Sequence, residues 1–321
     1  MKKIILALIL LVFFLIDLPA QQLPIFTQYR ENQGYINPAS LNSDFFSYEH
    51  NMSVGASHRS QWVGFEGSPT TQTVKVEYLS QTENAFELLT GGYFMKDEAD
   101  PMGMTGVYGR LGAILTDGDA YFGGLSVGMT VGLVQYRTAI DKLNIRDGQD
   151  ISAINQQKLF PDVGLGIYYY KRMGRGDFMY VGASIPQVFG LDLTFDAGNT
   201  NEFSIQRIQH VYGLLGYYKY INEDSFIEFS AWPKYAPNVP FHVDANVRYQ
   251  MSSTVWVGTG LSTVGNLHLE CGLVFGYNVG LEDSAFRLGY GYGHTFRSYA
   301  IPGAFGATHE INLTYSFISK R

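Results

Sequence analysis

The sequence has few of the features that mark a soluble, disulfide-bonded or nucleic-acid-binding protein. Charged residues make up only 16% of the chain, below the usual share of about 25% in soluble domains. The single cysteine, Cys271, excludes an internal disulfide framework. The formal net charge of −7 argues against nucleic acid as a partner, because phosphate backbones are bound by basic surfaces. After residue 20, no apolar run is long enough to form a membrane-spanning helix.

Motifs for catalysis and for metal or phosphate binding are also missing from the sequence. The 7 histidines are scattered, and none belongs to a His-Glu-x-x-His pattern. There is no Gly-x-Ser-x-Gly elbow, and Cys271 lies on an apolar face, where an inert thiol is expected. The sequence therefore predicts no enzyme, no cofactor and no metal site. A hydrolase inside a barrel is a remote alternative, with His242/Asp244 and His268/Glu270 as the lumen-facing pairs to test.

The first twenty residues have the layout of a secretory signal peptide. Two lysines precede an apolar core over residues 4–16, and the stretch ends in a small residue, Ala20. The apolar run is shorter than the roughly 18 residues that a retained membrane anchor needs. We therefore expect export and cleavage between Ala20 and Gln21.

Glycine and aromatic residues are abundant, and the sequence alternates between apolar and polar residues. The chain has 36 glycines, 23 tyrosines and 22 phenylalanines. Apolar and polar residues alternate over 241–251, 267–279 and 311–317. A period of two over about ten residues is typical of a strand that crosses a membrane, with its apolar face toward lipid and its polar face toward the lumen. Strands of a soluble sandwich alternate too, but they are usually about five or six residues long.

The pattern predicts an all-β fold, a transmembrane outer-membrane β-barrel of about 14 antiparallel strands. The expected strands are 47–59, 70–80, 85–96, 103–116, 121–137, 163–172, 177–184, 206–221, 225–234, 239–250, 254–263, 267–279, 285–295 and 307–317. Short connections alternate with longer ones, which include 60–69, 138–162, 185–205 and 296–306. Short turns on one rim and long loops on the other are typical of outer-membrane barrels, so we expect the protein in the cell outer membrane.

The last expected strand, HEINLTYSF, ends in an aromatic residue near the C-terminus, as the last strand of an outer-membrane barrel usually does. We expect it to close the barrel against strand 47–59 and to act as the recognition strand for insertion. Leu313, Tyr315 and Phe317 then lie on the lipid face.

Three parts of the chain follow from this pattern: a signal peptide (1–20), a periplasmic N-terminal segment (21–46) and the barrel (47–321). A barrel of this size is wider than the eight-stranded kind that side chains alone fill, so its lumen holds either water or a plug. The N-terminal segment and the long loops supply material for a plug. Charges of both signs on the polar faces favour an internal network over a selective pore. These residues are Lys75, Glu77, His242, Asp244, Arg248, Glu270 and Arg287.

The stretch HRSQWVGFEG in the first long loop leaves two interpretations open. In one, Trp62 and Phe65 belong to the aromatic girdle at the membrane interface. In the other, the loop folds inward, and Arg59 and Glu66 meet charges on the lumen wall.

Two motifs and four later segments carry a resemblance to a known protein family. The opening PIFTQYRENQGYINPAS supplies Phe26, Gln28, Tyr29, Asn32, Ile36, Asn37, Pro38 and Ala39. A second stretch supplies Arg59, Gln61, Trp62, Gly67, Pro69 and Thr71. The four later segments follow at 160–169, 183–189, 234–249 and 308–317. In this order, the segments resemble the PorP/SprF family of type IX secretion proteins of Bacteroidetes.

The resemblance implies an outer-membrane anchor or adaptor associated with type IX secretion and gliding motility. Such a protein couples exported surface proteins to the membrane or to periplasmic machinery. The implied partners are outer-membrane lipid, proteins of the secretion or gliding machinery, and a secreted surface protein. The residues named for the two motifs are then candidates for partner contact. A channel for small or hydrophobic solutes is the alternative function.

Overall fold

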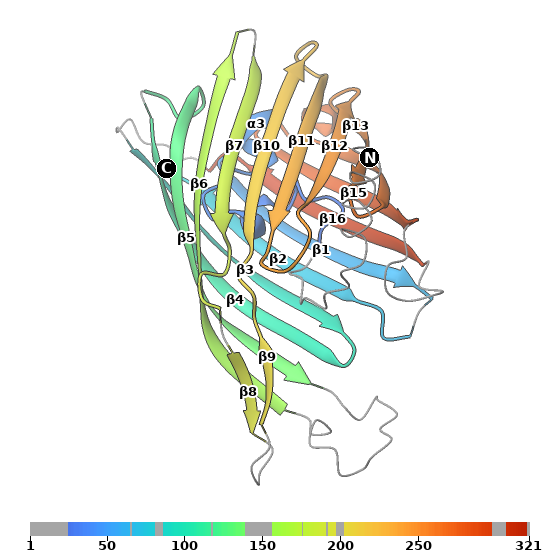
Figure 1. The fold of residues 1–321 in the computed structure, drawn as a ribbon. Helices are drawn as coiled ribbons and strands as arrows, with labels where there is room; N and C mark the ends of the chain where they lie inside the picture. The colour runs from blue at the N-terminus through green and yellow to red at the C-terminus, as the bar shows by residue number, and fades with distance from the viewer. Residues whose placement is uncertain are drawn as a thin grey trace, which may run out of the picture.

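The computed structural model describes residues 25–64, 66–80, 86–116, 118–138, 156–174, 176–190, 192–196, 202–296 and 306–319. It is a closed antiparallel barrel in which each strand is bonded to its two neighbours (Figure 1). The barrel strands are β1 (Met52–Val63), β2 (Thr70–Leu79), β3 (Phe86–Ala99), β4 (Met102–Leu115), β5 (Gly123–Thr138), β6 (Gln156–Met173), β7 (Asp177–Ile185), β10 (Val211–Tyr220), β11 (Phe226–Tyr235), β12 (His242–Gln250), β13 (Val255–Ser262), β14 (Asn266–Phe275), β15 (Ser284–Thr295) and β16 (Ala307–Phe317). The predicted fold, a barrel of 14 antiparallel strands, is confirmed.

The barrel is closed by the pairing of its first and last strands. Ala56 of β1 lies opposite Leu313 of β16, and Met52 lies opposite Phe317. One further sheet stands apart from the barrel: β8 (Asp192–Asp196) and β9 (Glu202–Gln206) form a hairpin in the connection between β7 and β10. The hairpin extends beyond the barrel wall next to the ends of β5 and β6 (Figure 1).

Side chains alternate between the two faces of the wall as the sequence predicts. In β12, Asp244, Asn246 and Arg248 are buried toward the lumen, whereas Ala245 and Val247 are exposed on the outer face. This arrangement follows from the bilayer, because lipid favours apolar side chains and offers no partner for polar groups. Among the described residues, none of the helices combines the length and the apolar character needed to cross a bilayer.

Several predicted boundaries differ from the structure. The first strand begins at Met52 and not at residue 47, because residues 43–48 form helix α3 (Ser43–Tyr48). The Asn42 side chain caps this helix by accepting a hydrogen bond from the Phe45 amide. β6 begins at Gln156, well before the predicted residue 163, because it pairs along the full length of β5. At the end of β14, residues 277–279 form a 3-10 helix, η3 (Tyr277–Val279), and not the predicted strand end.

The barrel has two rims, defined here by the ends of its strands. The long-connection rim contains the last residues of β1, β5, β7 and β15 and the first residues of β2, β6, β10 and β16. The short-turn rim contains the opposite strand ends, for example the last residues of β6, β10 and β12 and the first residues of β7, β11 and β13. In outer-membrane barrels the rim with short turns faces the periplasm.

Candidate functional site: the N-terminal segment in the lumen

Residues Ile25–Tyr48, called the lumen segment here, pass through the inside of the barrel. At the long-connection rim, Ile25 and Phe26 line a small cavity together with Thr295 and Thr308. At the short-turn rim, α3 places Phe46 against aromatic residues of the wall. Almost every residue between these points is buried. The sequence predicts that residues 21–46 begin in the periplasm and leaves open whether they plug the barrel. The described part of this stretch occupies the lumen, where the wall supplies partners for its polar groups.

Arg30 anchors the lumen segment to the charged side of the wall. Its Nη2 atom lies 2.5 Å from Glu270 Oε2, and its Nε atom lies 3.2 Å from Glu228 Oε2. Both carboxylates are fully buried. A buried guanidinium is tolerated only when it is paired and hydrogen-bonded, so these two contacts fix the position of Arg30. The sequence does not indicate that Arg30 and Glu228 belong to the site.

Glu31 makes the complementary contact with two arginines of the wall. Its carboxylate lies 3.0 Å from Arg248 Nη1 and 2.6 Å from Arg287 Nη2. Lys75 donates a hydrogen bond to the Glu31 carbonyl oxygen. Glu31 therefore holds both arginines by ion pairs that are almost completely buried.

Two further ion pairs extend the network toward α3 and β4. Arg287 Nε lies 2.8 Å from Asp44 Oδ1 at the start of α3. Arg110 of β4 is ion-paired with Glu77 and also donates to the Pro38 carbonyl oxygen at 2.7 Å. The wall charges predicted to face the lumen therefore meet the lumen segment or one another.

The Asn37-Pro38 part of the segment packs where the wall carries glycines. Asn37 Nδ2 donates to the Ile167 carbonyl oxygen of β6 at 3.0 Å. A Cβ atom at Gly166 would collide with the Asn37 side chain, and a Cβ atom at Gly128 would collide with the Pro38 backbone. Glycine is therefore required at these points of close approach. This gives a structural reason for Asn-Pro in the opening motif.

The short-turn end of the lumen is filled by an aromatic cluster around Phe46. Its ring centroid lies 5.6 Å from that of Tyr170, 5.4 Å from Phe178 and 5.8 Å from Tyr218. The Tyr220 hydroxyl donates to the Phe46 carbonyl oxygen at 3.1 Å. These inward tyrosines were not expected from the sequence, because its apolar faces were assigned to lipid. The sequence feature that could have indicated them is the run of three tyrosines at 168–170. In a strand the first and third point to one face, and in the structure only the middle one is exposed.

The beginning of the lumen segment is held by Glu310 of β16. The Glu310 carboxylate accepts from the Thr27 amide at 2.6 Å and from the Gln28 amide at 3.2 Å. The Tyr29 hydroxyl is 2.8 Å from Ser230 Oγ of β11. Phe26, Gln28 and Tyr29 are all buried. The opening motif therefore makes internal contacts along its whole length.

The second motif lies at the mouth of the lumen on the long-connection rim. Arg59 is buried, donates to Gln61 Oε1 at 2.7 Å and lies 3.8 Å from Glu310 Oε2. The register of β1 shifts between Ser60 and Val63, and within this bulge Trp62 adopts a left-handed φ of 54°. The chain thus turns Arg59 inward and leaves Trp62 partly exposed.

The other residues of this loop are distributed over its surface. Glu66 is exposed, and the predicted girdle residue Phe65 lies outside the described residues. Gly67 has a positive φ of 74° and is partly exposed. The Pro69 carbonyl oxygen accepts from the Gln61 amide at 2.9 Å, which closes the loop at its base.

The connection between β7 and β10 also covers the opening of the lumen at the long-connection rim. A Cβ atom at Gly164 of β6 would collide with the Pro186 backbone, so this connection crosses the inner face of β6. Arg207 holds it by donating to Gln187 Oε1 at 2.8 Å and by pairing with the buried Asp162. The lumen is therefore covered at the long-connection rim by part of the chain that precedes β10.

The remaining predicted residues lie away from the lumen or are already paired. Leu313 and Tyr315 are exposed on the outer face, and Phe317 at the end of β16 is partly exposed. Ala20 and Gln21 lie outside the described residues. The carboxylates of the two pairs named for a hydrolase are engaged by Lys234 (Asp244, 2.5 Å) and by Arg30 (Glu270). Within the described ranges, no group of three or more His, Cys, Asp or Glu residues is placed to hold a metal ion.

Comparison with known sequences identifies a protein family. A family model described as "Type IX secretion system membrane protein PorP/SprF" matches residues 18–315. No curated protein matches the sequence.

Solved structures resemble the chain in fold. A deltaS2S3 mutant of the TodX monoaromatic hydrocarbon channel has a TM-score of 0.55 at 12% identity, covering 90% of this chain and 94% of that chain. The Pseudomonas putida toluene transporter TodX gives 0.53 at 9% identity, with 90% and 94% covered. The CymD monoaromatic hydrocarbon channel gives 0.52 at 10% identity, with 90% and 93% covered. At such low identities the likeness shows the fold alone.

Proposed function

The chain belongs to the PorP/SprF family of type IX secretion system membrane proteins, and from this premise we propose that it is a closed anchor or adaptor, not an enzyme or an open pore. Its family and its outer-membrane barrel fold give it a general role in type IX secretion. In the proposed role, the barrel couples exported surface proteins to the membrane or to periplasmic machinery, including machinery that drives gliding.

One observation carries this proposal: the lumen is filled by the chain's own N-terminal part. The segment is held by Glu310 near one rim, by the ion pairs of Arg30 and Glu31 in the middle, and by Phe46 near the other rim. A solute path through the lumen would have to displace these contacts. Removing one partner of a buried ion pair typically costs about 3–5 kcal/mol, so the filled state supports a closed barrel.

The two ends of the lumen segment explain how a closed barrel can act as an adaptor. Ile25 is partly exposed at the long-connection rim, and Glu49, directly after α3, is exposed at the short-turn rim. One covalent stretch thus joins the two sides of the membrane. A partner bound near Arg59, Gln61 and Trp62 on the outside would lie next to the start of that stretch.

A channel for small or hydrophobic solutes is the second candidate function. It is favoured by the names of the similar structures, which are channels and transporters for monoaromatic hydrocarbons or toluene. In a channel role the lumen segment would have to move aside or leave a passage. The contacts of Arg30, Glu31 and Phe46 oppose such movement, so we prefer the adaptor.

Planar-bilayer recording together with mild crosslinking in cells tests the proposal. We expect no large, steady conductance from the isolated protein and recovery of a periplasmic or surface-displayed protein after crosslinking. A variant that lacks residues 25–41 should conduct, which shows that a missing wild-type signal reflects closure and not failed insertion. A large, steady wild-type conductance with no crosslinked partner would make the channel the better assignment.

A further inference from the structure

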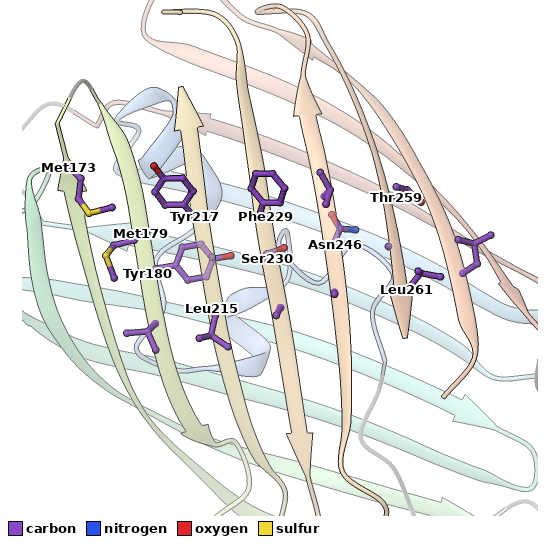
Figure 2. A pocket seen from close by; sticks show the side chains of 17 residues that line it. Met173, Met179, Tyr180, Leu215, Tyr217, Phe229, Ser230, Asn246, Thr259 and Leu261 are labelled. Carbon is purple, nitrogen blue, oxygen red and sulfur yellow. The ribbon is translucent and has the colours of Figure 1, made fainter. Parts of the chain in front are cut away.

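An apolar hollow lies on the outer face of the barrel wall, separate from the lumen. Its volume is about 750 Å³, and its lining extends from the end of β6 across β7, β10, β11, β12 and β13 to Leu267 of β14. Figure 2 shows Met173 and Met179 at one end and Thr259 and Leu261 at the other. Lining residues such as Phe229 and Leu261 are exposed on the outside of the barrel. The hollow therefore opens toward the bilayer.

The register of the sheet explains why the wall is hollowed here. Leu215 of β10 lies opposite Ala231 of β11, Ala231 lies opposite Ala245 of β12, and Ala245 lies opposite Leu261 of β13. Two short side chains thus lie side by side between two long ones in the same outward row. In the next row, Phe229 borders the two alanines. Ala231 and Ala245 form the floor of the hollow, and the larger side chains form its sides.

The chemistry of the lining indicates an apolar ligand. Most of the outward side chains are those of Met, Leu, Val, Phe and Ala. The hydroxyl of Thr259 already donates to the His268 carbonyl oxygen at 3.0 Å, and that of Tyr217 donates to Asp177 Oδ2 at 2.7 Å. Polar groups of a ligand would lose hydrogen bonds on entering such a surface. Hydrocarbon is also the medium that surrounds this part of the wall.

Charged residues stand beside the hollow at the short-turn rim. Lys219 Nζ lies 2.7 Å from Asp177 Oδ2, and the Lys219 side chain is 57% exposed. Lys171 of β6 is exposed and lies opposite Met179, which lines the hollow. Ammonium groups at the membrane surface attract lipid phosphates. An apolar hollow with Lys171 and the Lys219–Asp177 ion pair at its rim end matches the two parts of a phospholipid, whose phosphate can accept hydrogen bonds from both ammonium groups.

We propose that the hollow is a binding site for one phospholipid of the periplasm-facing leaflet. One acyl chain lies over Ala231 and Ala245, and the phosphate is bound by Lys171 and Lys219. The leaflet follows from the position of the two lysines at the short-turn rim. A chain seated in the hollow contacts protein on several sides, so it gains more dispersion energy than a chain on a convex wall. The proposal does not depend on the adaptor role.

Native mass spectrometry of the full-length barrel tests this site. The protein is extracted in mild detergent and incubated with dioleoyl phosphatidylethanolamine. We expect the wild type to retain one lipid and Ala231→Trp to lose it, because the indole fills the hollow while the outer face stays apolar. Ala56→Trp is the matched control, since Ala56 of β1 is also an outward alanine and lies opposite Leu313 of β16. This variant should retain the lipid.

The headgroup contact is tested separately with the double variant Lys171→Ala/Lys219→Ala. It should bind dioleoyl phosphatidylethanolamine more weakly than the wild type does, whereas dioleoylglycerol, which has no phosphate, should bind equally to both. Heat-modifiable migration on a gel checks that each variant folds, and Ala245→Leu replaces Ala231→Trp if the latter does not. Equal lipid retention by Ala56→Trp and Ala231→Trp overturns the proposal. Recovery of a protein bound to the hollow in place of lipid also overturns it.

Discussion

Replacing Glu31 with glutamine should loosen the lumen segment from the charged side of the barrel. The Glu31 carboxylate lies 3.0 Å from Arg248 and 2.6 Å from Arg287. Arg287 retains Asp44 at 2.8 Å, whereas Arg248 is left with the Gln250 amide at 3.5 Å. Glutamine keeps the shape of the side chain and removes its charge. The main consequence is one buried guanidinium that has lost its counter-charge.

The size of the effect follows from which arginine is left without a carboxylate. Breaking a buried ion pair by removing one partner costs about 3–5 kcal/mol. Because Arg287 keeps Asp44, we expect the lower end of this range, about 3 kcal/mol. A factor of ten corresponds to about 1.4 kcal/mol, so the ratio of released to seated segment should rise by roughly 100-fold.

Amide hydrogen exchange of peptides that cover residues 25–48 measures the released fraction in the purified barrel. We expect faster exchange in these peptides for Glu31→Gln and unchanged exchange in the barrel strands. Glu223→Gln, at an exposed position on the short-turn rim, is the control and should behave like the wild type. The same exchange in Glu31→Gln and in the wild type would refute the assignment of Glu31 as an anchor of the lumen segment.

Three further predictions concern the lipid-facing side of β16, the effect of low pH on the lumen segment, and the orientation of the barrel in the membrane. Leu313→Asp places a carboxylate on the lipid face, at a cost on the order of 1–3 kcal/mol near the bilayer centre. The amount of protein in the outer membrane and the fraction that shows heat-modifiable migration on a gel should therefore fall. Normal values for both would contradict the orientation of β16. Burial lowers the pKa of His50, just before β1, from 6.5 to about 4. The folded state therefore favours neutral His50, and the contribution of His50 to stability is complete above pH 6.5 and is lost as the pH falls toward 4. Amide hydrogen exchange of residues 25–48 should rise over this interval in the wild type and rise less in His50→Gln. Identical pH profiles in the two proteins would exclude His50 as the cause. In a Cys271→Ala background, an impermeant maleimide added to intact cells should label Ile25→Cys but not Glu49→Cys, and the reverse result would invert the topology.

The strands could be predicted because each strand separates two different environments. Lipid on one side and lumen on the other impose a period of two, as in β12, where Asp244 and Arg248 face inward and Val247 faces outward. The same rule failed for the aromatic part of the lumen. Tyr168 and Tyr170 are fully buried inside, but an apolar face gives no indication of whether it meets lipid or a plug.

The path of the lumen segment could not be predicted, because its contacts join residues that are far apart in the sequence. Arg30 pairs with Glu270 and Glu228, and Glu31 pairs with Arg248 and Arg287. No local pattern in the sequence identifies such partners. The acidic and basic residues on the polar faces of the strands did indicate an internal network of charges. The sequence also offered the N-terminal segment as one source of a plug, but it did not indicate which of its residues complete the network.

The two motifs that resemble the family differ in what they can contact. The opening motif is buried: Gln28 and Asn37 are fully enclosed by the wall, and Phe26 is nearly so. Its side chains are therefore unavailable to a partner while the segment is seated, and they hold the segment in the lumen. The second motif reaches the surface, because Trp62 is partly exposed next to the buried Arg59. If the barrel is the adaptor proposed above, a partner would therefore contact its rims, and on the outer rim we expect the contact at the loop that contains Trp62.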